Sequence, residues 1–353
     1  MPFYSRLRTH PARERVAERL LALRAQLRAE IPPRRVTETL LLASWNIRDF
    51  DSNKFGHGPR LPESFYYIAE IISAFDLVAV QEVNRNLSAL KEVMRILGPD
   101  WTYMVTDTTE GRAGNQERMA FVYDKSKILF RNIVGEIVIP DSEMPSGQRQ
   151  FARSPFFVSF QSGWFKFSLC TVHIYYGSDS GEALEQRIAE IDQIAGFIAK
   201  RAKSEPGNFI LLGDFNIVSP EHRTMQALTE HDFIIPKPLQ GLPTNMFGTK
   251  HYDQIAFRVR EGELELGDSP KPAGVLQLYN SVFRPEEYGA YQEFMDPKKR
   301  DISEKGETLD EKGKQKYYEG EWRTFQMSDH LPLWVELKID FSDQYLRELA
   351  AQK

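Results

Sequence analysis

The sequence predicts a large α/β sandwich built as one domain. Short apolar runs rich in β-branched and aromatic residues recur along the chain, and there are too many of them for a helical bundle. Between some of these runs lie longer segments in which apolar residues recur at helical spacing. The chain shows neither an internal repeat nor a Gly/Ser-rich linker, so a single domain is the economical interpretation.

The elements follow from these patterns in chain order. Strands are predicted at 39–45, 77–83, 101–106, 119–123, 156–160, 165–172, 209–212, 254–257 and 333–337. Helices are predicted at 62–74, 86–97 and 182–202. The main domain is therefore expected to span residues 38–340, followed by a tail at 341–353.

Two segments stand apart from this pattern. Residues 1–37 are rich in arginine, and Val16, Leu20, Leu23 and Leu27 recur at helical spacing, which predicts an amphipathic helical extension packed on the body. Residues 294–323 are almost wholly polar and predict a mobile surface insertion whose aromatic end packs at an edge of the body. Both segments could serve a regulatory protein partner.

Composition excludes several classes of protein. The chain has 353 residues, 41% of them hydrophobic, with a net charge of −5, so nucleic acid would need a local basic face. A single cysteine excludes an intramolecular disulfide and a zinc site built on thiolates. No apolar run reaches membrane length and no signal-like segment lies near the start, so no membrane association and a cytoplasmic location are expected.

The stretch LLGDFNIVSP at 211–220 raises the question of function. An apolar run that suits a buried strand gives way at once to Gly213, Asp214 and Asn216. Two positions apart on an extended backbone, Asp214 and Asn216 would point the same way, toward a phosphate or a cation. An ordinary turn at the end of a strand would use the same residue types.

Other predicted strands also have polar residues at their ends. Such residues occur in WNIRDF (45–50), VQEV (80–83), TVH (171–173), GDFN (213–216), YDQI (252–255) and SDHLPL (328–333). With GRAGNQER (111–118) and FARSP (151–155), these motifs resemble the endonuclease/exonuclease/phosphatase superfamily, and most closely its deoxyribonuclease I branch. The resemblance runs from about residue 40 to residue 337. It implies a four-layer α/β/β/α sandwich, two packed mixed β-sheets flanked by helices, with the active site at one edge.

The resemblance also implies a set of site residues. Asn46 and Glu82, with Asp329 nearby, would hold a divalent cation, and an all-oxygen site suits Mg²⁺ or Mn²⁺. Asp214 and Asn216 would hold the attacking water or a phosphoryl oxygen.

Two histidines complete the implied site. His173 and His330 would flank the scissile phosphate, with Glu117 and Asp253 as their carboxylate partners. Phosphoryl transfer is mostly positioning and charge neutralisation, which imidazoles and a cation supply. Which histidine acts as acid and which as base stays open, as does whether one metal or two act.

At the positions that would contact the substrate, this sequence matches the resembled branch only in part. Arg112 and Arg153 match arginines that bind the DNA backbone in the resembled branch. Where that branch places a groove-binding arginine, this sequence has Asn84 followed by Arg85, and Asn115 replaces an aromatic residue.

The sequence therefore predicts a magnesium-dependent hydrolase that nicks DNA with little sequence preference. The alternative keeps the chemistry but changes the substrate to a phospholipid headgroup, an inositol phosphate or a protein-linked phosphodiester. A binding module without catalysis would be expected to have a broken site, whereas every expected catalytic residue is present. DNA and RNA are not distinguished, and the oligomeric state is open.

Overall fold

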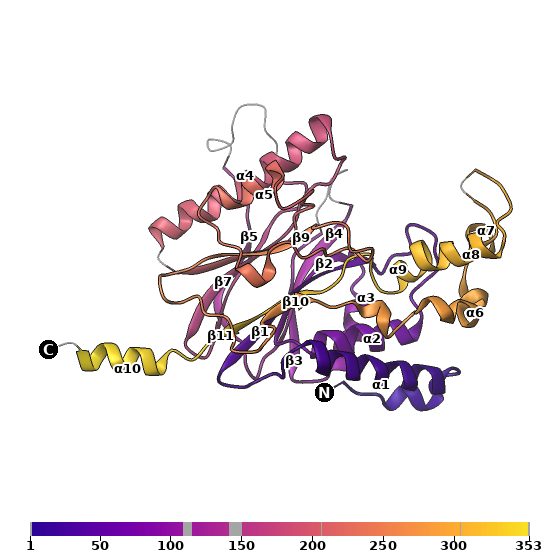
Figure 1. Cartoon of the computed structure of the whole chain (residues 1–353), viewed down its shortest axis with the longest axis horizontal. Helices are drawn as coiled ribbons and strands as arrows, with labels where there is room; N and C mark the ends of the chain where they lie inside the picture. The colour runs from indigo at the N-terminus through magenta and orange to yellow at the C-terminus, as the bar shows by residue number, and fades with distance from the viewer. Residues whose placement is uncertain (1, 109–114, 141–149, 206, 304, 352–353) are drawn as a thin grey trace.

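Two mixed β-sheets packed face to face form the centre of the protein in a computed structural model, which describes residues 2–108, 115–140, 150–205, 207–303 and 305–351. Figure 1 shows α4 and α5 on one side of the sheets and α1 and α2 on the other. The predicted four-layer α/β/β/α sandwich is thus confirmed.

The first sheet has six strands in the order β10-β11-β1-β2-β4-β3. These are β10 (Ala273–Val275), β11 (Leu333–Lys338), β1 (Thr39–Phe50), β2 (Leu77–Asn84), β4 (Glu117–Asp124) and β3 (Trp101–Val105). Strand β1 pairs parallel with β2 and antiparallel with β11. Its side chains alternate: Leu40 and Leu42 face the second sheet, whereas Leu41 and Trp45 pack beneath the helices.

The second sheet has five strands in the order β5-β6-β7-β8-β9. These are β5 (Leu129–Glu136), β6 (Phe156–Ser162), β7 (Phe165–His173), β8 (Asn208–Asp214) and β9 (Asp253–Arg258). Strands β7 and β8 run parallel, so His173 and Asp214 are direct neighbours at their carboxyl ends. The nine predicted strands are all present, and β5 and β10 are two that the sequence patterns missed.

Helices cover the outer faces of both sheets. The α-helices are α1 (Arg13–Glu30), α2 (Pro62–Ser73), α3 (Ser88–Leu97), α4 (Gly181–Ser204), α5 (Arg223–Thr229), α6 (Tyr288–Tyr291), α7 (Pro297–Arg300), α8 (Glu311–Tyr317), α9 (Arg323–Gln326) and α10 (Ser342–Ala351). Short 3₁₀ turns occur at η1 (Ser5–Thr9), η3 (Lys237–Leu239), η4 (Leu278–Asn280), η5 (Pro285–Glu287) and η6 (Gln292–Phe294). None of the described helices combines the length and the apolar character needed to cross a membrane.

The arginine-rich helix α1 lies against α2, with Leu20, Leu23 and Leu27 buried. Three of its arginines face carboxylates of the body: Arg15 pairs with Glu63, Arg24 with Glu70 and Arg19 with Glu287. These arginines act as ion-pair partners within the fold.

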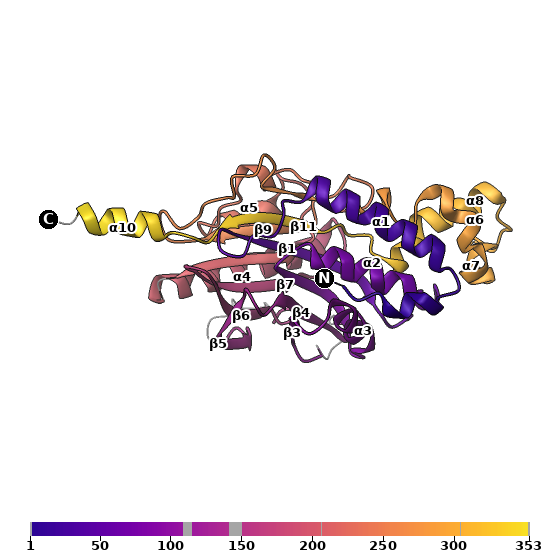
Figure 2. The same ribbon diagram turned by 90° about the horizontal axis from the view of Figure 1, so that it is seen from below.

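The polar segment 294–323 is more regular than the sequence predicted. It contains α7, α8 and a π-helical turn, η7 (Tyr318–Trp322), and it lies at the end of the molecule opposite α10 (Figure 2). Tyr318 and Trp322 are fully buried against Tyr291 and Phe283, so aromatic stacking fixes the segment to the body. The aromatic end of the segment packs on the body, as the sequence predicted, and few apolar anchors suffice for this because they are large rings. The predicted tail likewise contains a helix, α10, which projects from the body.

Candidate active site

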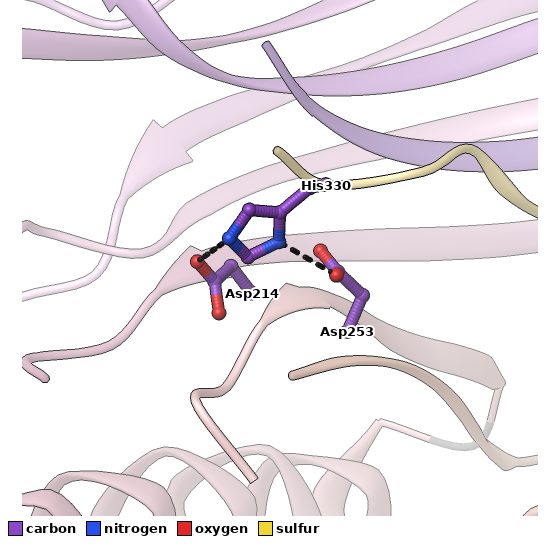
Figure 3. A group of neighbouring side chains, drawn as sticks. All are labelled: Asp214, Asp253 and His330. Carbon is purple, nitrogen blue, oxygen red and sulfur yellow. Dashed lines mark hydrogen bonds and ion pairs between the residues drawn. The ribbon is translucent and has the colours of Figure 1, made fainter. Parts of the chain in front are cut away.

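Two histidine–carboxylate pairs converge on Asp214 at one edge of the sandwich. Figure 3 shows His330 between Asp253 and Asp214: Nδ1 lies 2.8 Å from Asp253 Oδ2, and Nε2 lies 3.7 Å from Asp214 Oδ2. His173 approaches the same oxygen from the neighbouring strand, with Nε2 at 3.6 Å. The Nε2 atoms of both imidazoles thus point at one spot.

Burial and charge set the protonation of this group. Although burial opposes a charged imidazole, Asp253 and Asp214 raise the pKa of His330 well above its ordinary value. Burial would raise the pKa of Asp214, yet the charges of His330 and His173 lower it. His330 therefore carries a positive charge beside an ionised Asp214.

His173 has its own carboxylate, Glu117, as the sequence predicted. The Nδ1 atom lies 3.3 Å from Glu117 Oε2, an ion-pair distance without the alignment of a hydrogen bond. Arg153 Nε donates to the same oxygen at 2.7 Å, and Lys54 Nζ donates to Glu117 Oε1 at 3.2 Å. Burial works against ionisation of Glu117, but His173, Arg153 and Lys54 together hold its pKa well below the usual range.

Asn46 and Glu82 lie beside Asp214 and have the donor set of a hard cation. Asn46 Nδ2 donates to Glu82 Oε1 and to Asp214 Oδ2, both at 3.0 Å. Within the described part of the chain, Asn46 Oδ1 is buried without a hydrogen-bond partner. Burial and the carboxylates of Glu117 and Asp329 raise the pKa of Glu82, a cost that a bound cation would remove. These residues therefore fit a divalent ion with oxygen ligands.

The strand that supplies Glu82 is distorted at this point. Glu82 has φ = 59°, and the pairing of β2 with its neighbours shifts register there. A non-glycine residue in this conformation costs about 1–3 kcal/mol and is typical of functional sites. The distortion places the Glu82 carboxylate beside Asn46.

A second group of possible ligands overlaps the histidine pair. One atom each from Asp214, Asp253 and His330 lie within 4.8 Å of one another. Because His330 Nδ1 already contacts Asp253 at 2.8 Å, the present geometry is that of a hydrogen-bonded pair.

The site bridges the two sheets. Glu117 comes from β4 of the first sheet, whereas its partner His173 ends β7 of the second. Asn46 of β1 reaches Asp214 of β8 across the same boundary, and Gln81 Nε2 of β2 donates to Thr171 Oγ1 of β7 at 2.8 Å.

Asp214 and Asn216 come together differently from the sequence prediction. Strand β8 ends at Asp214, and Asn216 has φ = 52°, so the two do not share the face of an extended strand. Instead the backbone N–H of Asn216 donates to Asp214 Oδ1, and Asn216 Nδ2 donates to Ile174 O at 2.8 Å. The buried Arg187 supports this turn by donating to the carbonyl of Asn216.

The residues predicted to contact the substrate differ in burial and do not form one group. Arg112 lies outside the described residues. Arg153 is buried against Glu117 and the His173 carbonyl, Asn84 is partly exposed at the end of β2, and Arg85 is exposed next to it. Asp329 is partly exposed, 3.8 Å from Arg48 Nε.

Sequence reasoning missed the residues that support the site. Ser328 Oγ donates to Asn46 O, while the backbone N–H groups of His330 and Arg48 donate to it, so one hydroxyl links two motifs. Its place in SDHLPL was the available signal. Lys54 belongs to no motif, and only the folded chain shows that it reaches Glu117.

Comparison with known proteins identifies the family of this chain. Residues 43–260 match the model of the endonuclease/exonuclease/phosphatase family, and a comparison with curated proteins gives no match. Similar solved structures include a protein of that family from Bacteroides thetaiotaomicron (18% identity, 86% of this chain and 99% of that chain covered, TM-score 0.52). A mannosyl-6-phosphatase from the same species (18%, 84% and 99%, 0.53) and the human nocturnin catalytic domain with bound sulfate (13%, 86% and 94%, 0.51) are also similar.

At these identities the likeness to solved structures concerns the fold. The family match, in contrast, covers more than half of the chain and contains five of the motifs that place polar groups at strand ends. The protein therefore belongs to the endonuclease/exonuclease/phosphatase family and is a hydrolase of phosphoester bonds.

Proposed function

We propose that the protein is a divalent-metal-dependent phosphodiesterase that nicks DNA with little sequence preference. The convergence of His173 and His330 on Asp214 is the observation that supports this most directly. Hydrolysis of a diester needs a base for the attacking water and an acid for the leaving oxygen, and two imidazoles facing one spot supply both.

Each residue then has a role set by its contacts. Asp253 orients His330 and stabilises its positive charge, so that Nε2 can donate to a phosphoryl or leaving oxygen. Glu117 lies 3.3 Å from Nδ1 of His173 and orients that imidazole. Asp214 lies between the imidazoles and can hold the attacking water.

Asn46 and Glu82, with Asp329 at the rim, would hold the cation, and Mg²⁺ or Mn²⁺ suits their oxygen ligands. When bound, the ion would neutralise charge on the phosphoryl oxygens. Lys54 contacts Glu117 and Arg48 lies 3.8 Å from Asp329, so both add positive charge beside the site, although the chain as a whole has a net charge of −5. Local positive charge of this kind favours a polyanionic substrate.

The test is a plasmid-nicking assay. Supercoiled plasmid is incubated with Mg²⁺, Mn²⁺ or chelator at increasing salt, beside a His173→Ala/Asp214→Ala double variant. His231→Ala, a change at a histidine paired with Asp192 on the surface, is the matched control. We expect metal-dependent nicking that the control retains, the double variant loses and salt weakens.

The alternative substrates are tested with the same preparations. Phospholipid headgroups, inositol phosphates and a peptide-linked phosphodiester are assayed for release of alcohol or phosphate. A folded protein that hydrolyses one of these but leaves plasmid intact under every condition would overturn the DNA proposal.

A further inference from the structure

A loop beside the active site is held in place by the helical segment that follows residue 285. This loop, residues 51–61, leaves β1 just after the WNIRDF motif. Lys299 Nζ donates to Phe55 O at 2.6 Å and lies 3.4 Å from His57 Nε2. The His57 ring stacks on Phe325, with centroids 4.0 Å apart, and His57 Nδ1 lies 3.0 Å from the Tyr317 hydroxyl.

The base of the loop is fixed as well. Arg60 is buried, and its guanidinium donates to the carbonyls of Asp49 and Met327 at 2.8 and 3.0 Å. Gly58 N donates to Asn53 Oδ1 across the loop at 2.9 Å. The position of the loop is thus determined from both ends, which pre-organises the side chains at its tip.

This arrangement brings Lys54 to the catalytic centre. Its ammonium group donates to Glu117 Oε1, the carboxylate that pairs with His173, yet the side chain keeps 31% of its exposure. Arg153 and His173 already face the other oxygen of Glu117. A lysine has three donors, so Lys54 can bind a further anion on its exposed side without leaving Glu117.

The neighbourhood of Lys54 favours an anion with an attached organic group. The Phe55 ring is 48% exposed and lies 5.1 Å from the ammonium group, which leaves a surface on which a base or sugar can pack.

We propose that Lys54 is a specificity-determining residue that binds a second anionic group of the substrate, next to the phosphoester that is cut. This inference rests on the proposed hydrolysis of phosphoesters at the site. It adds that the substrate carries a second anionic group next to the phosphoester that is cut. The second anion can be the next phosphate of a nucleic-acid strand or the second phosphate of a small bisphosphate.

The experiment measures binding, so it does not depend on activity. All proteins carry Asp214→Asn, which prevents turnover and does not touch Lys54. Dissociation constants are measured by calorimetry in excess Mg²⁺ for thymidine 5′-phosphate, thymidine 3′,5′-bisphosphate and the dinucleotide pTpT. The Lys54 variants are Lys54→Ala and Lys54→Arg, and Lys312→Ala, an exposed lysine of α8, is the matched control.

We expect the second phosphate to tighten binding about 3- to 10-fold when Lys54 is present, as for a partly exposed ion pair with a hydrogen bond. Lys54→Ala should abolish that gain, whereas Lys54→Arg and Lys312→Ala should keep it. If Lys54 only supported the fold, Lys54→Ala would weaken the binding of all three ligands by the same factor. The ratios of their dissociation constants would then be unchanged. A gain with pTpT alone indicates a strand, and a gain with the bisphosphate as well indicates that small bisphosphates also fit.

The inference is overturned if the second phosphate brings no gain with Lys54 present, if the gain survives in Lys54→Ala, or if none of the three ligands binds. Plasmid nicking without a Lys54-dependent gain would remove this inference and leave the proposed function. A Lys54-dependent gain in affinity without plasmid nicking would remove the proposed nicking of DNA and leave this inference.

Discussion

Gly213, the glycine of the GDFN motif, is the position where adding a single methyl group should lower the stability of the fold most. Its φ is +133°, a conformation that other residues rarely adopt. A Cβ atom there would lie 2.2 Å from the carbonyl oxygen of Val172 and 2.9 Å from its nitrogen, both backbone atoms of the adjacent strand. Because backbone cannot move aside as a flexible side chain can, β7 and β8 would have to separate locally.

The expected loss combines two effects. The unfavourable backbone conformation costs about 1–2 kcal/mol, and overpacking costs about 1–3 kcal/mol more. Gly213→Ala should therefore lower the free energy of unfolding by about 2–5 kcal/mol, a large share of the roughly 5–15 kcal/mol typical of a domain.

Urea denaturation followed by circular dichroism measures the effect. Gly135→Ala is the matched control, because Gly135 also lies in the second sheet, yet a Cβ atom added there would meet no other atom within 4 Å. We expect the control to change stability by less than about 1 kcal/mol. Equal urea midpoints for the two variants, at equal m-values, would refute the reasoning.

Three further outcomes are expected. Glu82→Gln should abolish the rise in melting temperature that Mg²⁺ or Mn²⁺ causes, while Glu185→Gln on the exposed face of α4 should keep it. Burial and two nearby cations lower the pKa of His57 from 6.5 to about 4, so the unfolded chain takes up a proton first as the pH falls through that window. Stability should therefore drop between those values by about 1–2 kcal/mol more in wild type than in His57→Gln, which denaturation at pH 7 and pH 4.5 measures. Arg187→Met should cost about 1–3 kcal/mol in urea denaturation, because it removes the hydrogen bonds to the carbonyls of Tyr176, Ser178 and Asn216 and leaves that of the buried Asn216 unpaired.

The sequence was informative wherever local pattern and motif coincide. Every predicted strand and helix is present, because a continuous apolar run such as 77–80 must be buried on both faces of a sheet. The pairings of His330 with Asp253 and of His173 with Glu117 could be predicted from motif resemblance alone.

What the sequence did not predict depends on contacts between distant segments. β5 is largely exposed and therefore lacks the apolar alternation of a half-buried strand. The helices α7 and α8 lie in a polar segment without helical periodicity, and the Tyr318 ring that follows them packs on Tyr291, far away along the chain. Lys54 reaches Glu117 across 63 positions, a contact that no local pattern encodes.

Two residue pairs of the candidate site span the boundary between the sheets, which has a consequence for how activity would develop during folding. Neither sheet alone contains a complete site, since Glu117 and His173 belong to different sheets, as do Asn46 and Asp214. During folding, activity can arise only when the sheets dock, so it should report the last cooperative step and not the formation of either sheet. During unfolding it should vanish with the first separation of the sheets. The active site thus marks the assembled state of the whole sandwich.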